Sequence, residues 1–265
     1  MIITLTSDYG LSDNYVGILK GMLYSKLPQC NLVDISHNVT PFSVSNAAYM
    51  IGGAYKYFPE QTVHLIMVDA EISQYVMPVV VFWKNHYFVT VDNGILSILT
   101  RDDQNKTIFK LPYRAENRDT YLIEIATAIA QGQSILDLGG ELGVLKEMSI
   151  PNIAVNQDDT INGIVIHNDR YGNAITNIKR DDFEKIRAGR NYEISFRNSK
   201  IYKVYNSYID ITHEKQPTNA EKLAIFNSNN LLEIALWKAS PKNGTATTLL
   251  GLELNTTVSV KFFTE

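Results

Sequence analysis

The hydrophobic pattern of this chain changes near residue 150, and that change limits the possible folds more than any other feature. Before it, apolar runs of strand length alternate with segments of helical periodicity; after Pro151 the apolar segments are short, strand-like and separated by polar turns. Alternating strands and helices predict a layered α/β domain with a mostly parallel sheet, and closely spaced short strands predict a small barrel or sandwich. We therefore expect an α/β domain over residues 1–150 and a smaller, β-barrel-like domain over residues 158–265, with the boundary between Met148 and Asp158.

The same patterns place the individual elements. The first half predicts strands at Ile2–Thr6, Asn31–Ile35 and Thr62–Val68, a hairpin over Pro78–Trp83 and His86–Val91, and helices at Tyr15–Leu27, after Ser43 and at Asp119–Gln131. The second half predicts strands at Thr160–His167, Tyr192–Phe196, Ile201–Tyr205, Lys222–Phe226, Leu231–Trp237 and Thr257–Phe263, with one helix near Asp181–Ile186. We expect Asp169–Asn177 to be a loop around Gly172, because glycine permits a tight turn, and such a loop can present a carboxylate and two amides to a ligand.

Composition and charge exclude several classes of function. A formal net charge of −4 over 265 residues argues against general nucleic-acid binding, which favours a basic surface. The longest apolar runs, such as Val79–Trp83, are far too short to cross a membrane. The chain opens on a strand-like segment without a basic leader, and its single cysteine, Cys30, cannot form an internal disulfide. These observations predict a cytoplasmic protein with neither nucleic acid nor membrane as a partner.

Carboxylates follow two of the predicted parallel strands. Asp8 and Asp13 come after the first strand, and Asp69 ends the third. In open α/β sheets, ligands bind beyond the carboxyl ends of the strands. A carboxylate there suits the two hydroxyls of a ribose, because it can accept both hydrogen bonds at once. For Asp13 a structural interpretation is equally open, as the residue that caps the helix beginning near Asn14.

Other polar residues in the first half allow more than one interpretation. Asp92–Gly94 is either an ordinary turn or part of a site, and His37, which follows the second strand, fits a hydrogen-bonded structural role. Together with His37, the carboxylates Asp8, Asp13 and Asp69 also fit a metal-dependent hydrolase, since carboxylates beyond parallel strands suit divalent cations. The five histidines lack the close spacing of a zinc motif, and the sequence contains no P-loop, dinucleotide fingerprint or nucleophile elbow.

Several short motifs occur in a specific order over nearly the whole chain. They are Thr6–Gly10, Asp13–Gly17, Val33–His37, Phe58–Glu60, Asp92–Gly94, Asp169–Asn177, Asn227–Ser228 and Leu232–Ala235. Their order and spacing resemble the S-adenosylmethionine (SAM) hydroxide adenosyltransferases, relatives of the fluorinases and chlorinases. The resemblance implies an enzyme that cleaves SAM to adenosine and methionine with water or hydroxide. It also implies a homotrimer in which the first domain of one subunit and the second domain of its neighbour form each site, and we expect no metal.

The resemblance further implies roles for individual residues. Asp8 is expected to hold the ribose hydroxyls, and Asp13, Asp169 and Asn173 to surround the methionine end of SAM. The remaining expected contacts are Phe42, which walls the ribose side, and Tyr171 and Ser228, which approach other parts of the ligand.

The chain departs from the family pattern at the water-activating set of an Asp, an Arg and a His. Asp69 matches the Asp, but the Arg position falls on Val76 and the His position on Glu116. We expect Asp69, with Glu116, to orient the attacking water, and hydrolysis to be slow. A SAM- or adenosine-binding protein with weak or lost catalysis is the alternative interpretation.

Overall fold

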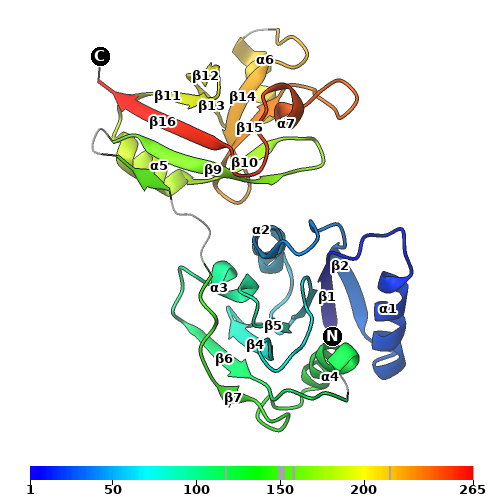
Figure 1. Ribbon diagram of the computed structural model, residues 1–265. Coiled ribbons are helices and arrows are strands. Elements are labelled where there is room, and N and C mark those ends of the chain that lie inside the picture. The colour runs from blue at the N-terminus through cyan, green and yellow to red at the C-terminus, as the bar shows by residue number, and fades with distance from the viewer. Residues whose placement is uncertain (117, 149–152, 157–158, 215, 265) are drawn as a thin grey trace. The chain divides into compact units, whose positions relative to one another are not determined.

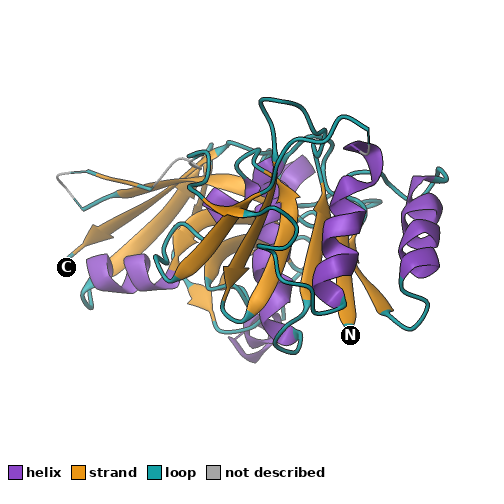
Figure 2. Ribbon diagram, turned by 90° about the horizontal axis from the view of Figure 1, so that it is seen from below, coloured by secondary structure: helices purple, strands orange, loops and turns teal. Residues whose placement is uncertain are grey.

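The computed structural model describes residues 1–116, 118–148, 153–156, 159–214 and 216–264. It divides into two compact units, Met1–Ile150 and Pro151–Glu265 (Figure 1). Part of the predicted boundary region, residues 149–152 and 157–158, lies outside the described residues. The first unit mixes helices and strands and the second is dominated by strands. Figure 2 distinguishes the helices and strands of the chain by colour.

A seven-stranded sheet in the order β2-β1-β3-β5-β4-β6-β7 forms the centre of the first unit. Its strands are β1 (Ile2–Ser7), β2 (Asn31–Ser36), β3 (Val63–Met67), β4 (Pro78–Trp83), β5 (His86–Val91), β6 (Lys106–Lys110) and β7 (Glu141–Leu142). Strands β2, β1, β3 and β5 pair in parallel, and the predicted β4–β5 hairpin reverses the chain so that β4, β6 and β7 continue antiparallel. The carboxyl ends of β1, β3 and β5 therefore meet at one edge of the sheet.

Helices cover both faces of this sheet. They are α1 (Tyr15–Lys26), α2 (Val44–Ala54), α3 (Ile95–Leu99) and α4 (Arg118–Ala130), with a short 3₁₀ turn at Tyr55–Tyr57. Successive residues of a strand point to opposite faces. Accordingly, Leu65 of β3 joins the core beneath α1 and α4, and Ile66 joins the core beneath α2 and α3. The predicted cap of α2 is confirmed, because the Ser43 hydroxyl accepts a hydrogen bond from the Asn46 backbone N–H.

The second unit is a strongly curved, nine-stranded sheet. Its strands are β8 (Ala154–Val155), β9 (Ile161–Asn168), β10 (Ala174–Lys179), β11 (Asn191–Phe196), β12 (Ser199–Ile201), β13 (Val204–Tyr205), β14 (Lys222–Phe226), β15 (Leu231–Leu236) and β16 (Thr257–Phe263). The path β12-β11-β16-β9-β10-β15-β14-β13 begins and ends on β12 and β13, which follow one another in the chain, so the sheet is nearly closed and barrel-like. The helical segments are α5 (Arg180–Arg187), a 3₁₀ turn at Tyr208–Asp210, α6 (Ile211–Glu214) and α7 (Ala246–Leu249).

The expected loop Asp169–Asn177 is only partly a loop. Strand β10 begins at Ala174, and Thr176 and Asn177 serve the sheet. The Thr176 hydroxyl donates to the Leu232 carbonyl at 2.9 Å, and Asn177 Oδ1 accepts the Ile164 backbone N–H at 2.8 Å. Asn177, the second amide expected in the loop, therefore lies in the sheet and its Oδ1 atom is hydrogen-bonded to the backbone of β9. Helix α3 and strand β6 were also not predicted.

Among the described residues, no helix is both long and apolar enough to span a bilayer.

Candidate functional site

Three residues singled out in the sequence meet at the carboxyl edge of the first sheet. Asp8, Phe42 and Asp69 line one pocket of about 400 Å³, together with Tyr9 and Glu71 and a few apolar side chains. They come from the segments after β1, before α2 and after β3. Because the parallel strands end at the same edge, residues far apart in the sequence are brought together there.

Asp8 stabilises both walls of this pocket. Its Oδ2 atom accepts the backbone N–H of Phe42 at 2.9 Å and that of Asp69 at 3.4 Å. Phe42 and Asp69 adopt positive φ values of 61° and 45°, a left-handed backbone that non-glycine residues rarely adopt and that needs support from the surrounding structure. No described residue donates a side-chain hydrogen bond to Asp8 Oδ1, so this oxygen is available to a ligand.

Asp69 is held from the other side by Asn93. The Asn93 Nδ2 atom donates to the carbonyl oxygens of Val68 and Asp69 at 3.0 and 2.9 Å. Burial raises the pKa of the Asp69 carboxyl, and the negative charges of Asp8 and Glu71 raise it further. A raised pKa makes this carboxylate a better acceptor for a proton from water than an ordinary aspartate.

The Asp92–Gly94 segment combines both interpretations left open by the sequence. Asp92 is buried, lies 2.5 Å from Lys110 Nζ and accepts the backbone N–H of Lys146, so its role is structural. Asn93 positions Asp69, and Gly94 adopts φ 104° at the start of α3. The turn thus connects the sheet to the pocket.

Two residues expected in the site, Asp13 and Glu116, do not line this pocket, and neither does Val76, which stands at the family's Arg position. Asp13 is exposed in the bend before α1, where the N-cap residue Asn14 makes no side-chain cap bond. Val76 packs against the core beneath α1 and α4, and Glu116 is exposed in the turn before α4. Within the first unit, therefore, the structure does not bring Glu116 or Val76 to the pocket that Asp69 lines.

His37 has a structural environment. Its ring is buried, with Nδ1 2.7 Å from the Ser7 hydroxyl, and its carbonyl accepts the Gly10 backbone N–H at 2.7 Å. Nε2 lies 3.1 Å from Asp34 Oδ1 but outside hydrogen-bonding geometry. His37 thus fixes the loop that carries Asp8. The residues that the structure describes contain no group of three or more His, Cys, Asp or Glu side chains placed to hold a metal ion.

The other four expected ligand contacts meet in the second unit. Asp169, Tyr171, Asn173 and Ser228 all line one pocket of about 800 Å³. Asp169 folds its own loop, because Oδ1 accepts the backbone N–H groups of Tyr171 and Asn173 at 2.9 Å each and Oδ2 accepts Asn173 Nδ2 at 2.9 Å. Gly172, at φ 75°, completes this turn in a left-handed conformation that glycine adopts without strain.

Sequence reasoning assigned no individual role to several other polar or aromatic residues of the same pocket, among them Tyr208, Asn227, Glu233 and Trp237. The Tyr208 hydroxyl donates to Glu233 Oε1, and Asn227 Nδ2 donates to Glu233 Oε2 at 3.2 Å. The signal for Glu233 was present, since it interrupts the apolar run Leu231–Leu236. A charge inside such a run indicates a buried, partnered carboxylate.

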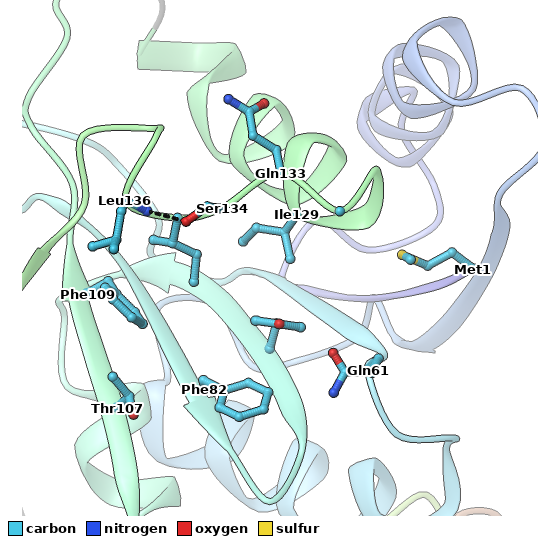
Figure 3. Close-up of a pocket in the computed structure, with 12 residues that line it drawn as sticks. Met1, Gln61, Phe82, Thr107, Phe109, Ile129, Gln133, Ser134 and Leu136 are labelled. Carbon is cyan, nitrogen blue, oxygen red and sulfur yellow. Dashed lines mark hydrogen bonds between the residues drawn. The ribbon is translucent and has the colours of Figure 1, made fainter.

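A further pocket of about 450 Å³ lies at the opposite, amino end of the first sheet (Figure 3). Phe82 and Phe109 line it from strands β4 and β6, and Ile129 lines it from α4. It holds none of the residues expected in the site.

Comparison with known proteins gives a consistent result. The chain matches the model of the SAM hydroxide adenosyltransferase N-terminal domain over residues 3–139 and that of the C-terminal domain over residues 163–259. A Methanocaldococcus jannaschii protein named (R)-S-adenosyl-L-methionine hydrolase is 33% identical over 187 residues, which cover 68% of each chain. A Thermus thermophilus protein of the same name is 27% identical over 263 residues, covering 93% of this chain and 94% of that protein. The crystal structure of an uncharacterized conserved protein from Thermotoga maritima has the same fold, with a TM-score of 0.83, 24% identity and coverage of 98% of this chain and 100% of that chain.

Proposed function

The chain belongs to the SAM hydroxide adenosyltransferase family, and we propose that it is an enzyme that cleaves SAM to adenosine and methionine with water or hydroxide as the nucleophile. Relatives that match most of the chain are named as hydrolases of this substrate. The observation that carries the proposal is the convergence of Asp8 and Asp69 in one pocket at the carboxyl edge of the sheet.

The reaction needs positioning more than activation. The sulfonium of SAM makes methionine a good leaving group, so the enzyme must place one water in line with the ribose 5′ carbon and exclude others. Asp8 Oδ1 accepts hydrogen bonds from the ribose hydroxyls, and Phe42 walls the pocket beside them. As the water oxygen bonds to the 5′ carbon, the carbon–sulfur bond breaks with its electron pair on sulfur, and the water proton passes to Asp69.

The incomplete water-activating set predicts a slow reaction. A general base contributes typically about 10²–10⁴ in rate, and Asp69, with its raised pKa, is the candidate in the pocket. No arginine lines this pocket among the described residues, and Glu116 does not line it either. These departures favour, as the second candidate function, a protein that binds SAM or adenosine with weak or lost turnover.

We also propose a homotrimer in which residues of the second unit of one subunit, among them Asp169, Tyr171, Asn173 and Ser228, complete the site of the next. One observation on α1 supports association. Leu19 and Leu23 face the core, and Tyr15, Ile18 and Met22 are exposed by 56%, 45% and 37%. A helix that is apolar on both sides is typical of one buried by a partner, here a second copy of the chain. Light scattering at micromolar concentration is expected to show a trimer, and Ile18→Glu to dissociate it.

The cytoplasm is the proposed location. The single cysteine, Cys30, is a buried free thiol, which is consistent with a reducing compartment.

The decisive experiment is cleavage of SAM in ¹⁸O-labelled water. The products are separated by chromatography and their masses are measured by mass spectrometry. We expect equal amounts of adenosine and methionine, with one labelled oxygen in adenosine, and no change on addition of EDTA. Asp69→Asn serves as the matched variant and is expected to release adenosine more slowly. Tight binding of intact SAM without products favours the binding protein, and loss of activity with EDTA favours the metal-dependent hydrolase that uses Asp8, Asp13, Asp69 and His37.

A further inference from the structure

Glu233 is a carboxylate buried in the wall of the second unit's pocket. It lies in the middle of the apolar strand β15 and is 5% exposed. Burial raises the pKa of Glu233 and the charge of Asp169 raises it further, while the polar hydrogens of Tyr208, Asn227 and Asn173 lower it. Burying a carboxylate costs free energy unless it is hydrogen-bonded, so its place in this strand requires a reason beyond packing.

Both oxygens of Glu233 act as acceptors for other segments. The Tyr208 hydroxyl donates to Oε1 and Asn227 Nδ2 donates to Oε2. The Asn227 amide cannot turn over, because its Oδ1 already accepts the backbone N–H groups of Asn229 and Leu231 at 3.0 and 3.2 Å. A carboxyl group whose two oxygens both accept hydrogen bonds is ionised, because a protonated carboxyl donates from one of them.

The hydrogen bond from Tyr208 to Glu233 also fixes how Tyr208 bonds to Asn173. Because the Tyr208 hydrogen points to Glu233, its oxygen accepts from Asn173 Nδ2, 3.1 Å away. The same Nδ2 donates to Asp169 Oδ2 at 2.9 Å, and a carboxylate can only accept there, which fixes the orientation of the amide. Asn173 Oδ1 receives no hydrogen bond from the part of the chain that the structure describes, and Asn173 lines the pocket.

We propose that Glu233 is a positioning residue: through Tyr208 it fixes the Asn173 amide so that its carbonyl oxygen accepts a hydrogen bond from an N–H group of the ligand. This rests on the proposed function, since SAM offers such donors in the 6-amino group of adenine and the α-ammonium group of methionine. A ligand with an acceptor at the same place is disfavoured, because two facing oxygens leave each other unsatisfied.

The test measures SAM cleavage by Glu233→Gln and Tyr208→Phe, singly and together. Glutamine keeps the volume of Glu233 but sets an NH₂ group against Tyr208 or Asn227, so one donor loses its acceptor. Each single change is expected to raise KM for SAM about tenfold and to leave kcat within about twofold. The KM of the double variant is expected to be no higher than that of the single variant with the higher KM, because both changes break the same chain of hydrogen bonds.

Binding of simpler ligands identifies the donor group. If it is the adenine amine, the wild type prefers adenosine to inosine, and Glu233→Gln reduces that preference. If it is the α-ammonium group, Glu233→Gln weakens S-adenosylhomocysteine but not 5′-methylthioadenosine, which lacks the amino acid. Either pattern supports the positioning role, and equal losses for all four ligands contradict it.

Glu193→Gln is the matched control. Glu193 lies on β11, where it forms an exposed ion pair with Lys200 at 2.9 Å, and it does not line the pocket. This variant is expected to keep the wild-type KM. Thermal unfolding establishes that each variant is folded, and Tyr208→Phe carries the same expectation if Glu233→Gln does not fold.

Two results overturn the inference in distinguishable ways. A wild type that cleaves SAM, with a folded Glu233→Gln or Tyr208→Phe variant of unchanged KM, or with fully additive losses in the double variant, removes the positioning role alone. A wild type that neither binds nor cleaves SAM removes the proposed function as well.

Discussion

Asn93 fixes the backbone of Asp69: the Asn93 Nδ2 atom lies 2.9 Å from the Asp69 carbonyl oxygen, and its Oδ1 accepts the Ile95 backbone N–H at 3.3 Å. One side chain therefore connects the start of α3 to the left-handed residue after β3. This places Asn93 behind the carboxylate that we propose as the proton acceptor, without direct access to the substrate.

Replacing Asn93 is expected to reduce turnover. In Asn93→Ala the Asp69 turn loses its amide support and moves, and small misplacements of a reacting group cost up to about 10²-fold in rate. We expect kcat to fall about 10- to 100-fold with a smaller change in KM. Asn105→Ala, an exposed asparagine before β6, is the control and is expected to keep the wild-type kcat.

Asp8 has a double role that two ligands can separate. Asp8→Ala removes the acceptor for the ribose hydroxyls and also the support of Phe42 and Asp69. Calorimetry is expected to show adenosine binding weakened by about 1.5–3 kcal/mol, as for a hydrogen bond to a charged group. Displacement of Phe42 or Asp69 weakens the binding of 2′,3′-dideoxyadenosine as well. Loss of the contact to the ribose hydroxyls does not, because this ligand lacks them. Equal losses for both ligands would show that Asp8 acts on the walls alone.

Positions 76 and 116 do not line the pocket of the first unit, but the family resemblance places them beside the reacting water, and it predicts that restoring the family's Arg and His accelerates hydrolysis. Val76→Arg and Glu116→His together should raise kcat more than the sum of the single changes, because groups that act as a unit are not additive. Val76 packs against the core, so Val76→Arg also lowers stability, and the melting temperature must be measured beside the rate. Rates that are unchanged in a folded double variant would mean that these positions are remote from the reacting water.

The buried histidine pair of the first unit makes stability depend on pH. His64 Nδ1 lies 2.7 Å from the Thr4 hydroxyl and Nε2 3.2 Å from His86 Nδ1. Burial, and to a smaller extent the neighbouring His86, lower the pKa of His64 to about 3. A depressed folded-state pKa gives stability that is present above the unfolded value near 6.5 and is lost as the pH falls towards 3.

We therefore expect the free energy of unfolding to fall by about 2 kcal/mol between pH 7 and pH 5 from this group. Urea titrations of the wild type and His64→Gln at both pH values measure the effect, and the variant should lose most of this dependence. His213→Gln, at an exposed histidine, should keep the wild-type slope. An identical slope in all three proteins would assign the pH dependence to other groups.

The sequence predicted those features that local chemistry determines. Ser43 was recognisable as a cap and Lys84–Asn85 as a hairpin turn, because each depends on neighbouring residues. Asp8 and Asp69 were recognisable because they end parallel strands. Strand β10 was missed because Gly172 and Asn173 suggested a continuing loop, whereas the chain pairs with β9 directly after the turn and with the distant β15 on its other side.

Contacts between distant segments set the limit of the prediction for the site as well. Glu233 belongs to the Leu232–Ala235 motif, but its partners Tyr208 and Asn227 lie on separate segments that only the barrel brings together. Conversely, Asp13 and Glu116 were expected in the site by position along the chain, and the pocket of the first unit does not include them. Their roles, like those of the other site residues, stay predictions.

The mixed sheet of the first unit has a consequence for folding. Strands β4, β5 and β6 are neighbours both in sequence and in the sheet, whereas Asp8 contacts the backbone of Asp69 across 61 positions of the chain. Sequence-local pairings form quickly, and pairings that close long loops form slowly. We expect the antiparallel half to fold early and the parallel half to join it late, so that the substrate pocket is among the last regions to become protected from hydrogen exchange. Newly synthesised chains would then pass through a stage with a formed hairpin and no affinity for ligand.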